Sequence, residues 1–258
     1  MRNTAIDDVD KLDCPVLAIG TDYPPRHLLA EHRHRRAQLL YSATGVMQVA
    51  TIDGTWTVPT QRAVLIPPDT DHQVLMEDVS TRSLYIEPTV APWFPTRCQV
   101  VEVSPLLREL LLAAVDLPTD YQLRGRDSTL VDLILYEIQS VAPLAFDLPM
   151  PRHAALLQRC QAFAMAPSIR ETPQQWATEL GLSTRTFNRM FRVQTGLSFQ
   201  QWRQRASTMY AIRLLSTGKN VTQTATALGY STPAAFSTMF SRHTGTAPNS
   251  FLLPHTSR

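Results

Sequence analysis

Three histidines are the residues of the N-terminal half whose types and spacing could do chemistry. His32 and His34 flank a single arginine, and His72 follows the Pro-Pro-Asp turn at residues 67–69. Residues two apart on a β-strand point to the same face, so His32 and His34 are predicted to present two imidazoles side by side. Three imidazoles can ligate a divalent metal, contact an effector directly, or serve as hydrogen-bonded core histidines. The two readings without metal are favoured.

Arginines carry the chemistry of the C-terminal half. Residues 1–149 contain 12 Lys and Arg against 20 Asp and Glu, a net charge of −8, whereas residues 150–258 contain 12 against 2, a net charge of +10. Arginine forms bidentate hydrogen bonds to phosphate and to guanine edges. The charge therefore favours a polyanionic partner, although a basic solvated face or sequence-independent DNA coating would give the same balance.

A repeat in the C-terminal third indicates how those arginines are presented. Segment 176–196 matches segment 224–245, and each copy has Ala, Leu-Gly, a Ser or Thr, Phe, Met-Phe and Thr-Gly in that order. The small alanine lets two helices cross closely, Gly181 or Gly229 supplies a left-handed turn, and the hydroxyl residue caps the next helix. Each copy is predicted to be a helix-turn-helix, and the capped repeat argues against sequence-independent coating.

The elements that must position these residues can be predicted from periodicity. Residues 198–218 form an amphipathic helix that holds the two motifs about one DNA turn apart. Between residues 36 and 87, short β segments separated by Gly, Pro and Asp fit a small all-β barrel. Two leucine-rich helices between residues 104 and 142 cover that barrel or pair with a second subunit, with both roles expected.

We therefore expect an α+β multidomain chain. Its predicted parts are a barrel that senses an effector (1–100), a helical hairpin for packing or dimerisation (101–142), a linker with three prolines (143–151) and an all-α domain with two helix-turn-helix motifs joined by a long helix (152–258). The chain has no apolar run long enough to span a membrane, its first residues are acidic, and its three cysteines are widely spaced. A cytoplasmic protein with reduced thiols and no membrane partner is expected.

The C-terminal third, above all the stretch GYSTPAAFSTMFSRHTGTAP, resembles the DNA-binding domain of the AraC/XylS family of bacterial regulators. The stretches EHRHRRAQLLYSATGVMQV and RAVLIPPDTDHQV resemble the cupin-type sensing domain of one branch of that family. The resemblance implies a sequence-specific transcription regulator that binds a double-stranded DNA operator and responds to a small-molecule or metal effector. It also implies a homodimer, with RNA polymerase as a partner if the protein is an activator.

The resemblance places the DNA-facing positions of the first recognition helix on Thr184, Arg185, Asn188 and Arg189. Arginine can donate hydrogen bonds to O6 and N7 of guanine, and asparagine can form hydrogen bonds with adenine. Arg192 lies farther along the helix and is expected on a phosphate.

The second recognition helix departs from the family pattern because its outward positions lack a long bidentate side chain. These positions are Pro233, Ala234, Ala235, Ser237 and Thr238. Alanine and threonine methyls could contact thymine, while Arg242 and His243 could reach the DNA backbone. This helix is expected to anchor the protein and to read DNA shape.

In the sensing half, the metal-binding cupin pattern has a carboxylate at the position that Gln38 occupies here. This substitution disfavours the alternative function, a metal-dependent cupin enzyme with an appended nucleic-acid module, and we expect no enzymatic activity. A divalent metal held by the three histidines stays a minor alternative. Arg33, Arg35 and Arg36 could attract an anionic effector. A small-molecule pocket in the barrel would be lined by Tyr41, Met47, Trp56 and Tyr85.

Overall fold

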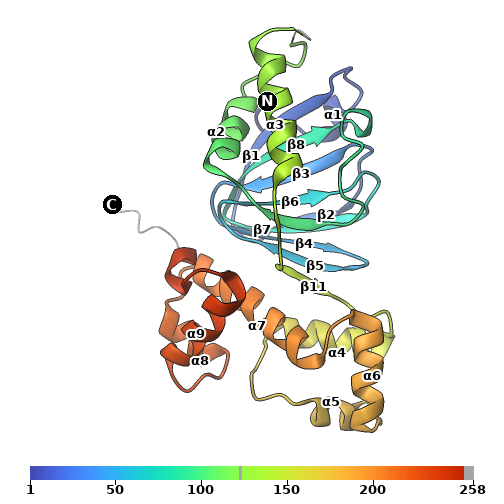
Figure 1. The fold of residues 1–258 in the computed structure, drawn as a ribbon, viewed down its shortest axis with the longest axis vertical. Coiled ribbons are helices and arrows are strands. Elements are labelled where there is room, and N and C mark those ends of the chain that lie inside the picture. The colour runs from blue at the N-terminus through green and yellow to red at the C-terminus, as the bar shows by residue number, and fades with distance from the viewer. Residues whose placement is uncertain (122–123, 253–258) are drawn as a thin grey trace. The chain divides into compact units, whose positions relative to one another are not determined.

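The computed structural model describes residues 1–121 and 124–252, so the last six residues of the predicted C-terminal domain lie outside the described part. The chain forms two compact units (Figure 1). The N-terminal unit comprises residues 1–51 and 58–144. The C-terminal unit comprises residues 52–57 and the chain from residue 145 onward.

The N-terminal unit is rich in antiparallel sheet, as predicted. One sheet has the order β1 (Val16–Tyr23), β8 (Val79–Ile86), β3 (Ala37–Ser42), β6 (Arg62–Ile66), β9 (Gln99–Glu102) and β10 (Pro143–Leu144). In a second layer, β7 (His72–Glu77) pairs with both β4 (Val46–Thr51) and β2 (His27–His32). Short helices α1 (Ile6–Val9) and η1 (Pro88–Val90) flank these strands.

Strand β3 is buried along its whole length and separates two environments. Its residues Leu39 and Tyr41 pack in one hydrophobic core with α2 (Pro105–Ala114) and α3 (Arg126–Ser140). Because side chains alternate along a strand, Gln38 lies on the opposite face, where its cross-strand neighbour is Tyr85. The sheet therefore has an apolar face that packs against the helices and an opposite face that carries polar side chains.

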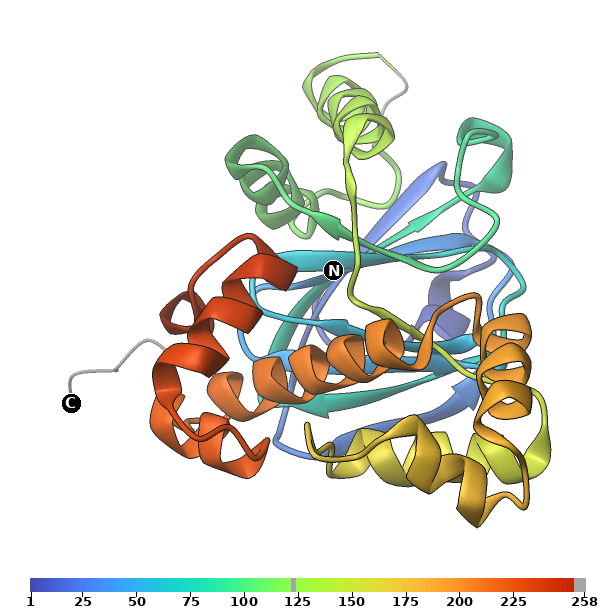
Figure 2. The same cartoon turned by 60° about the horizontal axis from the view of Figure 1, so that its bottom comes forward.

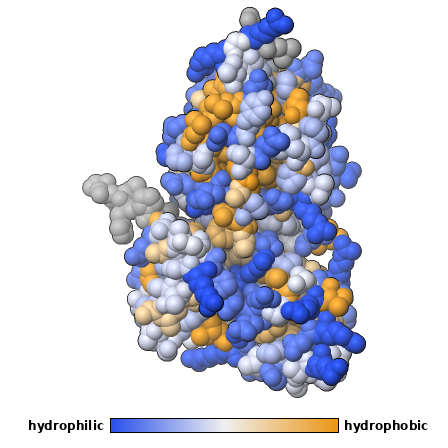
Figure 3. Space-filling model, viewed as in Figure 1, coloured by the Kyte–Doolittle hydropathy of each residue, from blue (hydrophilic) through white to orange (hydrophobic). Residues whose placement is uncertain are grey.

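Helices α2 and α3 bury only part of their apolar surface. Ser104 caps α2 by accepting a hydrogen bond from the amide of Leu107. Leu106, Leu133 and Tyr136 stay 49%, 39% and 70% exposed, and apolar atoms are visible over this region in Figure 3.

The C-terminal unit contains all the remaining helices of the described residues. They are α4 (Ala154–Met165), α5 (Pro173–Glu179), α6 (Thr184–Thr195), α7 (Phe199–Ser216), α8 (Val221–Ala227), α9 (Pro233–Thr244) and η2 (Pro248–Phe251). Figure 2 shows the long helix α7 from the side, with the pair α5–α6 towards one end and the pair α8–α9 towards the other. The unit also contains an antiparallel pair formed by β5 (Gly54–Val58) and β11 (Asp147–Pro149).

The two helix pairs have the same turn chemistry that the repeat predicted. Gly181 and Gly229 adopt φ of +66° and +83°, which favours glycine. Ser183 caps α6 through the amide of Thr186, and Thr232 caps α9 through the amide of Ala235. The same local sequence therefore builds the same bend twice.

An aromatic core holds the first pair against α7. Trp176, Phe187, Phe191, Phe199 and Trp202 are buried, and the centroid distances among their contacting rings run from 4.9 to 6.3 Å. Such a core fixes the orientation of α6 relative to α7. No helix in the part of the chain that the structure describes has the length and apolarity to span a lipid bilayer.

Candidate nucleic-acid interface and polar cluster

One face of α6 is exposed and carries the predicted DNA-contacting side chains. Arg185, Asn188, Arg189 and Arg192 are all exposed, while Phe187 of the same helix is fully buried. Spacings of three and four residues place these four side chains on a single helical face. Thr184 is half-buried at the first position of the helix.

The arginines on this face have no anionic partner among the described residues. Of residues 150–258, only Glu171 and Glu179 carry carboxylates. Arg159 binds both, at 2.6 Å and 2.7 Å, and its guanidinium carbon lies 4.3 Å from the centroid of the Trp176 ring. The carboxylates are therefore neutralised beside the core, and the positive charge of α6 stays available to an external anion.

A groove of about 640 Å³ runs beside these arginines. Its lining comprises Pro173, Asn188, Arg189, Arg192, Ser198, Phe199, Gln200 and Arg203. The Arg203 guanidinium donates to the backbone carbonyls of Ile169 and Glu171, so this side chain is held in place. The groove combines the recognition face of α6 with the start of α7.

The corresponding face of α9 is small and uncharged. Pro233, Ala234, Ala235 and Thr238 are exposed and Ser237 is half-buried. Arg242 is exposed in the last turn. Burial, with the nearby Arg242 and Arg205, lowers the pKa of His243. Positive charge on α9 is therefore confined to its C-terminal end.

His32, His34 and His72 lie together in the N-terminal unit. The ring centroids of His32 and His72 are 4.3 Å apart, those of His34 and His72 are 5.2 Å apart, and those of His32 and His34 are 6.2 Å apart. The expectation that His32 and His34 share one strand is wrong, because β2 ends at His32 after an irregularity in its pairing with β7. Cross-strand pairing of His32 with His72 brings the rings together instead.

Each histidine of this cluster is oriented by a hydrogen bond to a backbone carbonyl two residues away. The Nδ1 atoms of His32, His34 and His72 lie 2.8, 2.7 and 2.8 Å from the carbonyl oxygens of Ala30, Arg36 and Thr70. Because a carbonyl only accepts, the Nδ1 of His72 carries the proton, and the neutral ring of this residue keeps a lone pair on Nε2. The Nε2 of His72 is buried and has no hydrogen-bond partner.

Gln38 connects the histidines to the polar face of the sheet. Its side-chain carbonyl oxygen lies 3.1 Å from His34 Nε2, and its amide nitrogen donates to the hydroxyl oxygens of Ser83 at 3.2 Å and Tyr85 at 3.1 Å. Sequence reasoning missed Ser83, although it lies two positions before Tyr85 and therefore on the same face of β8. We call the group His32, His34, Gln38 and His72 the polar cluster.

Burial favours the neutral forms of His34, His72 and Tyr85. It lowers the pKa of His72 to about 4 and also lowers the pKa of His34, and it raises the pKa of the Tyr85 hydroxyl. Among residues 1–121 and 124–252, no group of three or more His, Cys, Asp or Glu side chains is placed to hold a metal ion. The cluster as arranged fits hydrogen bonding better than metal ligation.

The four residues expected to line an effector pocket differ in their relation to this cluster. Tyr41 faces away from Gln38, in the core under α2 and α3, because the two differ by an odd number of positions along β3. Met47 is fully buried on β4, and Trp56 is buried on β5 in the C-terminal unit. Tyr85 contacts the polar cluster, with its ring centroid 5.1 Å from that of His34.

Two comparisons with protein families cover most of the chain. Residues 15–139 match the family model described as an AraC-like ligand binding domain, and residues 176–253 match a helix-turn-helix domain. The chain is 31% identical to the HTH-type transcriptional regulator NimR of Escherichia coli (strain K12) over 222 residues, which are 86% of this chain and 81% of NimR.

Further similarities are partial or distant. The chain is 31% identical to the HTH-type transcriptional regulator RipA of Corynebacterium glutamicum over 104 residues, 40% of this chain and 31% of RipA. The structure of unsaturated fatty acid bound wild-type ToxT from Vibrio cholerae aligns with 94% of this chain and 97% of its own at 15% identity and a TM-score of 0.39.

Proposed function

This chain belongs to the AraC family of DNA-binding transcription regulators, and we propose that both of its helix pairs bind the operator while the polar cluster binds the effector. The observation that carries the DNA-binding assignment is the exposed face of α6, whose arginines have no anionic partner within residues 1–121 and 124–252. Both pairs act as helix-turn-helix motifs, and α7 sets their separation.

The two motifs have different tasks in this proposal. Arg185, Asn188 and Arg189 read base edges in the major groove, because their side chains match guanine and adenine acceptors and donors. Thr184 and Arg192 lie at the two ends of the same face and contact the DNA backbone. The face of α9, made of Pro233, Ala234, Ser237 and Thr238, contributes methyl contacts and shape complementarity, with Arg242 on a phosphate.

Substitution of single arginines tests this division. Arg185→Ala and Arg189→Ala should each cost about 1–3 kcal/mol at one base pair and relax the preference there. Binding is measured on duplexes that the wild-type protein selects from a random library and on random duplexes. Arg126→Ala, which removes an exposed arginine of the N-terminal unit, is the matched control. Equal losses on selected and random duplexes would contradict the assignment of base contacts.

We further propose that the polar cluster binds a small molecule through hydrogen bonds. The unpartnered Nε2 of His72 accepts from a donor on the effector, and Gln38 orients the neighbouring His34 ring. Calorimetry with a metabolite library, and with Zn²⁺ alone, separates a small-molecule effector from a metal. Stoichiometric Zn²⁺ binding that is lost in His72→Phe would replace the hydrogen-bonding proposal with a metal site.

The remaining partners follow from the family and from exposed surface. The apolar side chains Leu106, Leu133 and Tyr136 on α2 and α3 support a homodimer through these helices. We also propose that the protein is a cytoplasmic regulator without enzymatic activity. It contacts RNA polymerase at any promoter that it activates.

A further inference from the structure

The segment predicted as a linker, residues 143–151, is largely built into the C-terminal unit. Leu148 is 2% exposed and packs in the same core as Trp176 and Trp202. Phe146 is 4% exposed. A segment that contributes a buried side chain to the core beneath α6 loses that burial if it moves.

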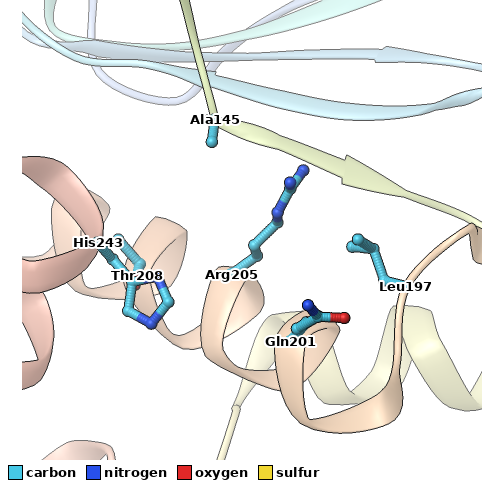
Figure 4. A pocket seen from close by; sticks show the side chains of 6 residues that line it. All are labelled: Ala145, Leu197, Gln201, Arg205, Thr208 and His243. Carbon is cyan, nitrogen blue, oxygen red and sulfur yellow. The ribbon is translucent and has the colours of Figure 1, made fainter.

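Two polar contacts fasten this segment to consecutive turns of α7. The indole N–H of Trp202 donates to the carbonyl of Pro149 at 2.8 Å, and the Arg205 guanidinium binds the Asp147 carboxylate at 2.6 Å. Figure 4 shows Arg205 pointing from α7 towards the strand that follows Ala145, beside a cavity of about 220 Å³. Residues 202 and 205 lie on one face of the helix, so both contacts hold the same strand.

The other edge of β11 is paired with β5. Leu148 lies opposite Thr55, Pro149 lies opposite Gly54, and the amide of Met150 donates to the carbonyl of Asp53. A Cβ on Gly54 would lie 2.7 Å from the carbonyl oxygen of Leu148, which is too close for any side chain. Gly54 is therefore required for the approach of β11 as well as for the turn that it forms with Asp53.

Beyond β11, the chain makes direct contact with the recognition helix. The backbone amides of Arg152 and His153 donate to the side-chain carbonyl of Gln194 in α6, at 2.9 Å and 3.2 Å. His153 then caps α4. A continuous set of contacts thus runs from β5 through β11 to the last turn of α6.

We infer that residues 145–153 form a latch that transmits the position of β5 to the recognition helix, so that DNA affinity depends on the docking of β11 on α7. Residues 52–57 continue directly from β4 and lead directly into the chain before β6, so a change in those strands reaches β5 through the covalent chain. The inference uses the DNA-binding function of the family and none of the proposed base or effector contacts.

The direction in which DNA affinity changes when one carboxylate is removed distinguishes this latch from simple electrostatics. Asp147→Asn and Glu179→Gln each remove one carboxylate from the C-terminal unit, and Arg159 keeps Glu171 in the second variant. Electrostatics alone predicts equal or tighter DNA binding for both variants. The latch predicts that Asp147→Asn binds the duplex selected by the wild-type full chain on the order of three-fold more weakly, because a partly exposed ion pair is lost. Equal affinities of the two variants would overturn the inference.

A second variant tests the latch without any change in charge. Gly54→Ala forces β11 away from β5 and should weaken binding to the same duplex, with faster amide hydrogen exchange at Leu148 and in the last turn of α6. Thermal unfolding of the full chain controls for loss of the fold. Unchanged affinity and unchanged exchange in folded Gly54→Ala would also overturn the inference.

Discussion

Arg36 has no exposed surface, and its charge is compensated inside the N-terminal unit. Its guanidinium binds Asp10 at 3.0 Å and Glu87 at 2.8 Å and donates to the carbonyl of Cys14 at 2.7 Å. Arg35 binds the same two carboxylates. The expectation that Arg35 and Arg36 attract an anionic effector is therefore wrong, because their hydrogen-bonding capacity is directed to partners that tie the N-terminal segment to β3.

His72 makes folding sensitive to acid. An unfolded histidine has a pKa near 6.5, whereas burial lowers the pKa of His72 to about 4, so the unfolded chain binds more protons between these values. The stabilising contribution is complete above about pH 6.5 and is lost as the pH falls towards 4. When the pH is lowered from 7.5 to 5, the free energy of unfolding should decrease by about 2 kcal/mol less in His72→Phe than in the wild type.

Urea unfolding at the two pH values measures this difference, and NMR titration of the His72 ring checks its cause. A ring signal that titrates near pH 6.5 would contradict the assigned neutral state. So would an unchanged pH dependence in the variant.

At the scale of elements, three helices of the C-terminal unit begin with capping boxes. The pairs are Thr172 with Gln175 on α5, Ser198 with Gln201 on α7, and Asn220 with Gln223 on α8. In each pair the first side chain accepts from the amide three residues later, and the glutamine accepts from the amide of the capping residue. The spacing is visible in the sequence, whereas the reciprocal hydrogen bonds require both side chains in the right rotamers.

The cap of α8 offers a graded test of the second helix pair. Asn220→Ala should lower the free energy of unfolding by about 1 kcal/mol, whereas Asn220→Gly should lower it by only a few tenths, because glycine leaves the orphan amides open to water. Urea unfolding of the full chain measures both. Equal losses for the two variants would show that the side-chain hydrogen bond does not decide the stability of α8.

At the scale of the whole molecule, opposite charges are divided along the chain, and binding to DNA should depend steeply on salt. Arg242 is exposed and is proposed to contact a phosphate. Arg242→Ala should therefore reduce the slope of log affinity against log salt by about 0.9 and weaken binding evenly across sequences. Titrations at several salt concentrations on selected and random duplexes measure the slope. A loss confined to the selected duplex, with an unchanged slope, would assign Arg242 to base reading instead.

The amino-acid sequence by itself determined the elements whose causes are local. The turn at Gly181, the caps at Ser104 and Ser183 and the exposed arginines of α6 follow from spacing and residue type, because helix periodicity and capping act within a few residues. The AraC resemblance and the charge division also needed nothing beyond the order of residues.

Only the tertiary structure decided what depends on distant pairing. The end of β2 at His32, the gathering of His72 with His34 and the exclusion of Tyr41 from that cluster follow from cross-strand register. The burial of Arg36 needs carboxylates that are 26 and 51 positions away in the chain. The docking of Leu148 and Asp147 on α7 likewise joins residues more than 50 positions apart. Such contacts arise from the packing of whole elements, which local patterns do not encode.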